Sequence, residues 1–101
     1  MTQLTQWVVN GLQLCEQEDI PLEYLHEIVA HGIVHPGGGS PEEWRFDARM
    51  VRVVRRAGHL YRDLEVDWGG IALALDLLQQ LEELRAENRR LRRQLSRFLV
   101  D

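Results

Sequence analysis

The last third of the sequence, residues 67–100, contains a heptad repeat that constrains the fold more than any other feature. Apolar residues recur there at alternating spacings of four and three, with one asparagine among them, at Leu77, Leu81, Leu84, Asn88, Leu91, Leu95 and Phe98. This spacing is that of the a and d positions of a left-handed coiled coil. About 32 helical residues rising ~1.5 Å each form a rod of about 48 Å, longer than a small domain needs for its own core. We therefore expect residues 67–101 to be a dimerisation arm.

The charges along this predicted rod are separated into an acidic and a basic segment. Asp76, Glu82, Glu83 and Glu87 come first, and they are followed by Arg89, Arg90, Arg92, Arg93 and Arg97. An antiparallel pair would place acid beside base, whereas a parallel pair would stack like charges, so we favour the antiparallel pair. Asn88, at an a position, would fix the register and the number of strands. The alternative is that the helix folds back on its own domain and only its last turns protrude.

The rest of the chain, residues 1–66, leaves room for one small domain within a total of 101 residues. Cys15 is the single cysteine, so it has no internal disulfide partner, as is usual in a reducing compartment. The sequence has neither a signal peptide nor an apolar run approaching the ~20 residues of a membrane span. These features predict a cytoplasmic protein that does not bind membranes.

The charge of the two parts of the chain is opposite in sign. Residues 1–44 contain seven acidic residues and no lysine or arginine, a net charge of −7. Residues 45–101 contain nine acidic residues and all twelve arginines, a net charge of +3. The acidic first part disfavours phosphate as a ligand and favours a basic protein partner.

The first part of the chain predicts a helix-turn-helix. Residues 4–9 are a strand candidate, and Asn10 can cap a short helix that ends near Glu18, with apolar contacts from Leu12, Leu14 and Cys15. A second helix would begin at Pro21 and end at Gly32, with an apolar face of Leu22, Leu25, Ile28 and Val29. Two short helices joined by about three residues are typical of this motif.

A β-hairpin wing and two further helices are predicted to follow. Strand candidates at residues 33–35 and 44–46 flank the Gly- and Pro-rich loop 36–41, so we expect these strands to pair as the wing. Asp47 would cap a third helix and Asp67 the long one. The third helix has apolar residues at helical spacing, namely Met50, Val51, Val54, Ala57, Leu60, Tyr61 and Leu64.

Two stretches resemble the winged helix-turn-helix domains of the MerR type. Residues 25–36 (LHEIVAHGIVHP) are similar to the second helix and wing entry of those domains, and residues 44–47 (WRFD) to the returning wing strand and the next helix cap. We therefore predict a mainly α fold with two parts: a MerR-like winged helix-turn-helix with a small β-hairpin wing at residues 1–66, and the long coiled-coil helix at residues 67–101.

A closer resemblance covers nearly the whole chain. Residues 67–75 (DWGGIALAL), 87–92 (ENRRLR) and 95–98 (LSRF) are similar to the chaperone-modulator family CbpM. The resemblance implies a protein that binds the J-domain of the DnaJ-like co-chaperone CbpA and inhibits its stimulation of a DnaK-type chaperone. It also implies inhibition of the partner's own DNA binding, and so an association with the nucleoid through that partner.

The resemblance, together with the charge pattern, suggests where the partner binds. J-domains present a basic helix to their chaperone, so an acidic surface on this chain could occupy that helix instead, with apolar anchors adding affinity. The candidate partner-binding residues are the acids Glu16, Glu18, Asp19, Glu23 and Glu27 and the aromatic anchors Tyr24, Trp44 and Tyr61. For each aromatic residue the alternative is a place in the core, and for Glu23 and Glu27 it is a solvated helix face.

Other functions remain alternatives. DNA-binding MerR proteins carry an arginine and tyrosines where this chain has His26, Glu27 and Ile28, so direct DNA binding through this helix is disfavoured. The arginine-rich end of the long helix could bind phosphate, or its charges could simply complement a helix C-terminus. A MerR-type regulator and a plain dimerisation adaptor are the competing functions.

Catalysis and cofactors are not predicted. His31 and His35 form the one close pair of potential metal ligands, but a helix-to-strand transition between them does not place both on one face. The chain shows no nucleophile with an identifiable base, and the loop at residues 37–39 lacks the Lys-Ser/Thr of a phosphate-binding loop. We therefore expect a binding protein with neither metal nor cofactor.

Overall fold

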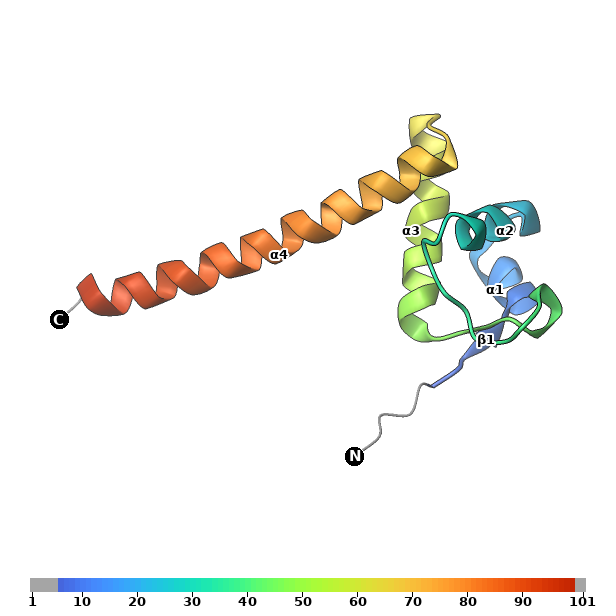
Figure 1. Cartoon of the computed structure of the whole chain (residues 1–101), viewed down its shortest axis with the longest axis horizontal. Coiled ribbons are helices and arrows are strands. Elements are labelled where there is room, and N and C mark those ends of the chain that lie inside the picture. Colours follow the sequence, from blue (N-terminus) through green and yellow to red (C-terminus); the bar gives the residue numbers. More distant parts are fainter. Residues whose placement is uncertain (1–5, 100–101) are drawn as a thin grey trace.

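The computed structural model describes residues 6–99 as a bundle of helices from which one long helix projects (Figure 1). Its elements in chain order are β1 (Val9–Asn10), α1 (Gly11–Glu18), α2 (Leu22–Ala30), the 3-10 turn η1 (Pro41–Glu43), β2 (Arg45–Phe46), α3 (Ala48–Leu64) and α4 (Trp68–Leu99). The predicted fold class, a mainly α helix-turn-helix with a small sheet and a long C-terminal helix, is therefore confirmed.

Side-chain caps begin α1 and α3 at the predicted residues. The Asn10 side chain accepts a hydrogen bond from the Gln13 N–H at 2.8 Å, and the Gln13 side chain accepts one from the Asn10 N–H at 2.8 Å. This reciprocal capping box satisfies two backbone donors at the start of α1. Asp47 accepts from the Met50 N–H at 2.8 Å and caps α3 in the same way.

The helix-turn-helix is formed by α1 and α2. Asp19, in the left-handed conformation at φ 53°, ends α1, and Ile20 turns into the core. Gly32, at φ +70°, ends α2 in a Schellman motif: its N–H donates to Val29, and the Ile33 N–H donates to Ile28 at 3.1 Å. Both helix ends therefore agree with the sequence prediction.

The predicted pairing of residues 33–35 with 44–46 is wrong. β2 pairs instead with β1, in antiparallel register, with Val9 opposite Phe46. The loop meets β2 only at Gly37, which exchanges two backbone hydrogen bonds of 3.0 Å with Arg45. Residues 33–35 cannot extend this ladder, because Ile33 completes the end of α2 and Pro36 has no N–H to donate.

The strand predicted for residues 4–9 is shorter in the structure, and it lies one residue further along the chain. It comprises Val9 and Asn10, while Val8 donates a backbone hydrogen bond of 2.9 Å to Phe46 without belonging to the strand. Residues 4 and 5 of the prediction lie outside the described residues. Asn10, which pairs with Arg45 in the sheet, is also the residue that caps α1, so the short strand leads directly into the first helix.

One hydrophobic core holds the helices and the sheet together. It draws on β1, both helices of the helix-turn-helix, β2, α3 and the first turns of α4, through Val9, Leu14, Ile20, Leu25, Ile28, Val34, Phe46, Val54, Ala57, Trp68 and Ile71. Several of these side chains are completely buried, so each contributes the transfer free energy of a full aliphatic or aromatic group. The start of the long helix is therefore anchored in the core.

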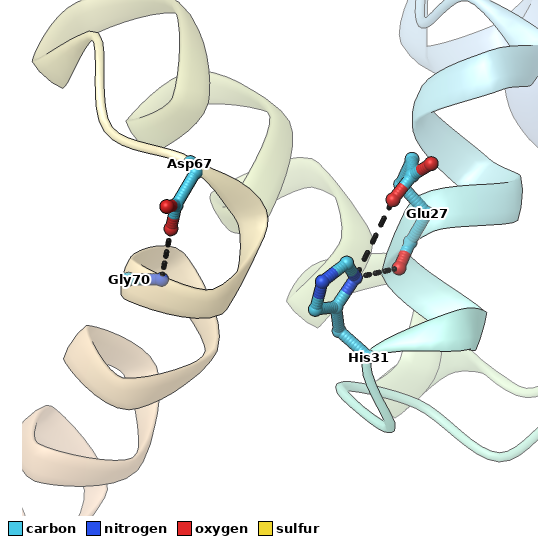
Figure 2. Close-up of polar contacts among 4 residues, drawn as sticks. All are labelled: Glu27, His31, Asp67 and Gly70. Atoms are coloured by element: carbon cyan, nitrogen blue, oxygen red, sulfur yellow. Dashed lines mark hydrogen bonds and ion pairs between the residues drawn. The ribbon is translucent and has the colours of Figure 1, made fainter.

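α4 leaves the core as an extended rod (Figure 1). Asp67 caps its first turn by accepting from the Gly70 N–H at 2.8 Å (Figure 2), as predicted. From Gln79 to Leu99 every residue is exposed, including Leu84, Leu91 and Phe98 of the heptad stripe. Val100, the last residue of the predicted helix, lies outside the described residues. Among residues 6–99, no helix combines the length and the apolar character needed to cross a membrane.

Candidate partner-binding surface

The exposed face of α2 carries two carboxylates and no positive charge from lysine or arginine. Leu25 and Ile28 turn into the core, and helical periodicity therefore places Glu23 and Glu27 on the opposite, solvent-exposed face. In a helix-turn-helix that binds DNA, the second helix enters the major groove. Carboxylates on that face would repel phosphate and attract cationic groups.

Glu27 also takes part in a local contact at the end of α2. The Nδ1 atom of His31 lies 2.9 Å from the main-chain oxygen of Glu27 and 3.5 Å from its Oε2, as Figure 2 shows. Both side chains remain substantially exposed, so the Glu27 carboxylate is still accessible to a partner.

The acidic residues at the end of α1 are less accessible to a partner than the sequence suggests. Arg55 of α3 donates two hydrogen bonds to Glu18, from Nε at 2.5 Å and from Nη2 at 3.1 Å. The Glu18 side chain keeps only 14% of its surface exposed, so it has little left for a partner. Arg62 donates from Nη2 to the main-chain oxygen of Asp19 at 2.6 Å, which brings a second cation to this turn. Glu16 stays exposed on α1.

The Glu18–Arg55 pair makes a pH-dependent contribution to stability. The Arg55 hydrogen bonds hold the pKa of the Glu18 carboxyl below its ordinary value. A carboxyl whose pKa is lowered in the folded state stabilises the fold at neutral pH, and this stabilisation is lost as the pH falls through the folded-state pKa. Glu18→Gln should therefore be less stable than wild type near neutral pH, and the difference should shrink toward about pH 3.

Urea unfolding of both proteins across this pH range measures the difference directly. Glu16→Gln is the matched control, because Glu16 is an exposed glutamate of the same helix. A Glu18→Gln penalty that stays constant from neutral to acid pH would contradict the assignment of this pair.

Two of the three predicted aromatic anchors belong to one packed cluster. Tyr61 stacks on Trp68 with 4.0 Å between ring centroids and 2° between planes, and Tyr24 meets both rings edge-on at 5.0 and 5.3 Å. Both tyrosines are half-buried, and Trp68 is buried. This cluster joins α2, α3 and the start of α4, so its first role is to hold the long helix in place.

Trp44, the third predicted anchor, lies on the other side of α2. Its ring is 5.1 Å from that of His26 and 6.2 Å from that of Phe46, measured between centroids. The order around α2 is Tyr24, Glu27, Glu23 and His26, which places the two glutamates between the aromatic cluster and Trp44. Tyr24, Glu27, Glu23 and Trp44 therefore follow one another across the exposed side of α2, whereas Glu16, Glu18 and Asp19 belong to α1 and the turn after it.

The sequence prediction missed an apolar groove beside Trp44. Leu12 and Leu22 line it, and they are 70% and 44% exposed, although both are predicted above as core contacts. The spacing of two between Leu12 and Leu14 could have revealed this, because residues two apart on a helix point to different sides and Leu14 is completely buried.

The basic end of α4 lies far along the exposed rod. Arg90 forms a same-helix ion pair with Glu87, with Nε 3.2 Å from Oε2. Nearer the core, Arg56 of α3 lies 3.5 Å from Glu82 of α4. These ion pairs neutralise part of the charge on the acidic and basic segments of the rod. Among residues 6–99, histidine, cysteine and carboxylate side chains form no group of three or more able to hold a metal ion.

The fold and the sequence together define a class of protein. Residues 11–93 match the family model described as MerR HTH family regulatory protein, a range that runs from the start of α1 into the last turns of α4. The match includes the helix-turn-helix, the wing loop, α3 and most of the rod, so the MerR-type architecture covers most of the described chain.

Similar proteins narrow the class to one family. Chaperone modulatory protein CbpM of Pseudomonas putida (strain W619) is 51% identical over 85 residues, covering 84% of each chain. CbpM of Pseudomonas entomophila (strain L48) is 47% identical over 85 residues, with the same coverage. CbpM of Salmonella paratyphi B is 42% identical over 87 residues, covering 86% of each chain. The chain therefore belongs to the family of chaperone modulatory proteins CbpM.

Proposed function

We propose that this protein modulates a chaperone system in the cytoplasm by binding the J-domain of a CbpA-type co-chaperone. Binding would block stimulation of the DnaK-type chaperone and the DNA binding of the co-chaperone. Membership of the CbpM family supports the chaperone-modulating role. The observation that carries the proposal is the acidic exposed face of α2, which Glu23 and Glu27 form without a lysine or arginine beside them on the helix.

Charge and apolar contact have different roles in this mechanism. Carboxylates on the face of the helix-turn-helix attract a basic helix, raise the rate of encounter and select the partner. Glu16, Glu23 and Glu27 are exposed and can act in this way, whereas Glu18 is engaged by Arg55. Most of the affinity of such a complex comes from a few buried apolar or aromatic anchors. By occupying the basic helix of the J-domain, the protein would deny it to the chaperone.

The proposal includes a homodimer held by α4. The six apolar heptad side chains from Leu77 to Phe98 are exposed along about 32 Å of rod at ~1.5 Å per residue, so within residues 6–99 this apolar stripe has no cover. A second copy with the same stripe would cover it. We propose the antiparallel arrangement, which brings Glu82 and Glu83 of one copy toward the arginines of the other.

Reversing the charge of the α2 face tests the proposed function. The double substitution Glu23→Lys and Glu27→Lys should weaken binding to the co-chaperone by about tenfold at low salt, and it should restore chaperone ATPase stimulation. The loss should shrink as salt is raised, because exposed charges are screened. Steady-state ATPase of a DnaK-type chaperone with full-length co-chaperone measures the effect.

The matched control reverses two carboxylates elsewhere. Asp63→Lys with Glu65→Lys changes the net charge equally, at exposed positions in the last turn of α3 and directly after it. This control should inhibit as wild type does. If wild type fails to inhibit at all, while it binds duplex DNA tightly and selectively, the protein is a DNA-binding regulator and the proposal is wrong.

A further inference from the structure

An apolar groove runs between α1, the start of α2 and the turn η1. It has a volume of about 310 Å³, and its lining includes Leu12, Leu22, His26, Pro41, Glu42 and Trp44. These residues come from three segments that are separate in the sequence, so the groove exists only in the folded chain. It lies on the His26 side of α2, next to the acidic face described above.

The walls of the groove are fixed by the core beneath them. Gly11 forms part of the lining, and a Cβ at that position would lie 3.4 Å from the Leu25 side chain and 4.0 Å from the Trp44 ring. Trp44 is held edge-on against Phe46, which is completely buried. A groove built on packed residues is already formed before a ligand arrives, and preformed sites lose less conformational entropy on binding.

Within residues 6–99, no part of the chain covers the rim leucines fully. Leu12 is 70% exposed and Leu22 is 44% exposed, and they lie at the mouth of the same groove as the half-buried Trp44. A contiguous apolar patch rimmed by polar groups is typical of a surface that binds another protein. Tryptophan is also enriched among the residues that contribute most to the affinity of protein interfaces.

The charges around the groove indicate the chemistry of its partner. Glu42 lines the groove, Glu16 follows Leu12 by one helical turn, and Glu23 is adjacent to Leu22. Residues 6–44 contain no lysine or arginine. A complementary ligand therefore has apolar side chains along its centre and cations along its edges, which is the pattern of a basic amphipathic helix.

We propose that this groove is the anchor site for a basic amphipathic helix of the partner protein. Two apolar side chains one turn apart on that helix would pack between Leu12, Leu22 and Trp44, and its cations would face Glu16, Glu23 and Glu42. The inference rests on the proposed function, since it names the surface on which the co-chaperone is held. The groove is assigned the anchoring of the partner helix, and Tyr24 and Tyr61 are assigned a structural role in holding α4 in place.

Making the rim polar tests the groove. Leu12→Ser with Leu22→Ser removes two exposed side chains, so the fold should be retained. Affinity for fluorescently labelled full-length CbpA-type co-chaperone, measured by anisotropy, should fall by at least about tenfold. Leu12→Met with Leu22→Met keeps the apolar surface and should bind within about threefold of wild type. Leu64→Ser, at a 51% exposed leucine of α3 outside the groove, is the matched control and should bind as wild type does.

The outcomes separate the groove from the function. If wild type and the serine variant bind the co-chaperone equally well, the groove inference is overturned while the proposed function stands. If wild type does not bind the co-chaperone, both fail. If the serine variant loses self-association in sedimentation, the groove holds the basic end of α4 from a second copy, and the inference is likewise overturned.

Discussion

Substituting Leu84 and Leu91 by glutamate is expected to convert the proposed dimer to a monomer. Both residues occupy d positions of the heptad and are 66% and 50% exposed in the single chain. In a coiled coil they would be buried against the partner helix, where an unpaired carboxylate costs several kcal/mol. Four such carboxylates in one dimer should raise the dissociation constant by at least about a thousandfold. Sedimentation equilibrium over a range of concentrations measures this constant.

The control for this variant adds the same charge to the outer face of the rod. Ala86→Glu with Ser96→Glu places two carboxylates at f and b positions, which face solvent in a coiled coil. This control should remain dimeric, and both variants should keep the helix-turn-helix, because the altered residues lie outside the core. A Leu84→Glu, Leu91→Glu protein that still dimerises like wild type would show that α4 is not the dimer interface.

Phe46→Ala is expected to be the most destabilising single substitution. Phe46 is completely buried, its ring packs edge-on against Trp44, and its backbone pairs with Val9. Truncating a fully buried phenylalanine costs about 3–5 kcal/mol, a large part of the ~5–15 kcal/mol that stabilises an ordinary domain. Urea unfolding followed by circular dichroism gives the free energy of unfolding, and both proteins are measured at equal chain concentrations because the proposed dimer would make stability depend on concentration.

Leu64→Ala provides the comparison for Phe46→Ala. Leu64 is 51% exposed at the end of α3, so its truncation should cost less than about 1 kcal/mol. A Phe46→Ala variant no less stable than Leu64→Ala would mean that β2 does not anchor the core. Such a result would also remove the support for the Trp44 wall of the groove.

The helices could be predicted because their ends depend on nearby residues. The capping side chains of Asn10, Asp47 and Asp67 bond to backbone groups three residues later, and Gly32 ends α2 through its own left-handed conformation. Interactions of this range are visible in the spacing of residue types. The start of α4 was predictable for the same reason.

The sheet could not be predicted in the same way. β2 has two residues and pairs with Val9–Asn10, which lie far earlier in the chain, so packing decides its partner. The sequence suggests residues 33–35 because they are near and aliphatic, but Pro36 and the end of α2 exclude them from the ladder. Short strands carry too little pattern to identify their partners.

The candidate site likewise has some features that nearby residues reveal and others that only the folded chain defines. Exposure of Glu23 and Glu27 follows from helical spacing once Leu25 and Ile28 are assigned to the core. The hydrogen bonds from Arg55 to Glu18 join residues 37 positions apart, and no local pattern announces them. The groove depends in addition on three segments meeting at one place, which only the folded chain defines.

Mapping amide chemical shifts during titration with a J-domain shows which surface of the protein receives its partner. We propose that the acidic face of the helix-turn-helix receives a basic protein helix in place of a nucleic acid. We expect the largest changes at the exposed amides of α2, around Glu23 and Glu27, with smaller changes beside Leu12. Duplex DNA should leave these amides unchanged. Changes confined to α4, or a response of α2 to DNA and not to the J-domain, would contradict the account.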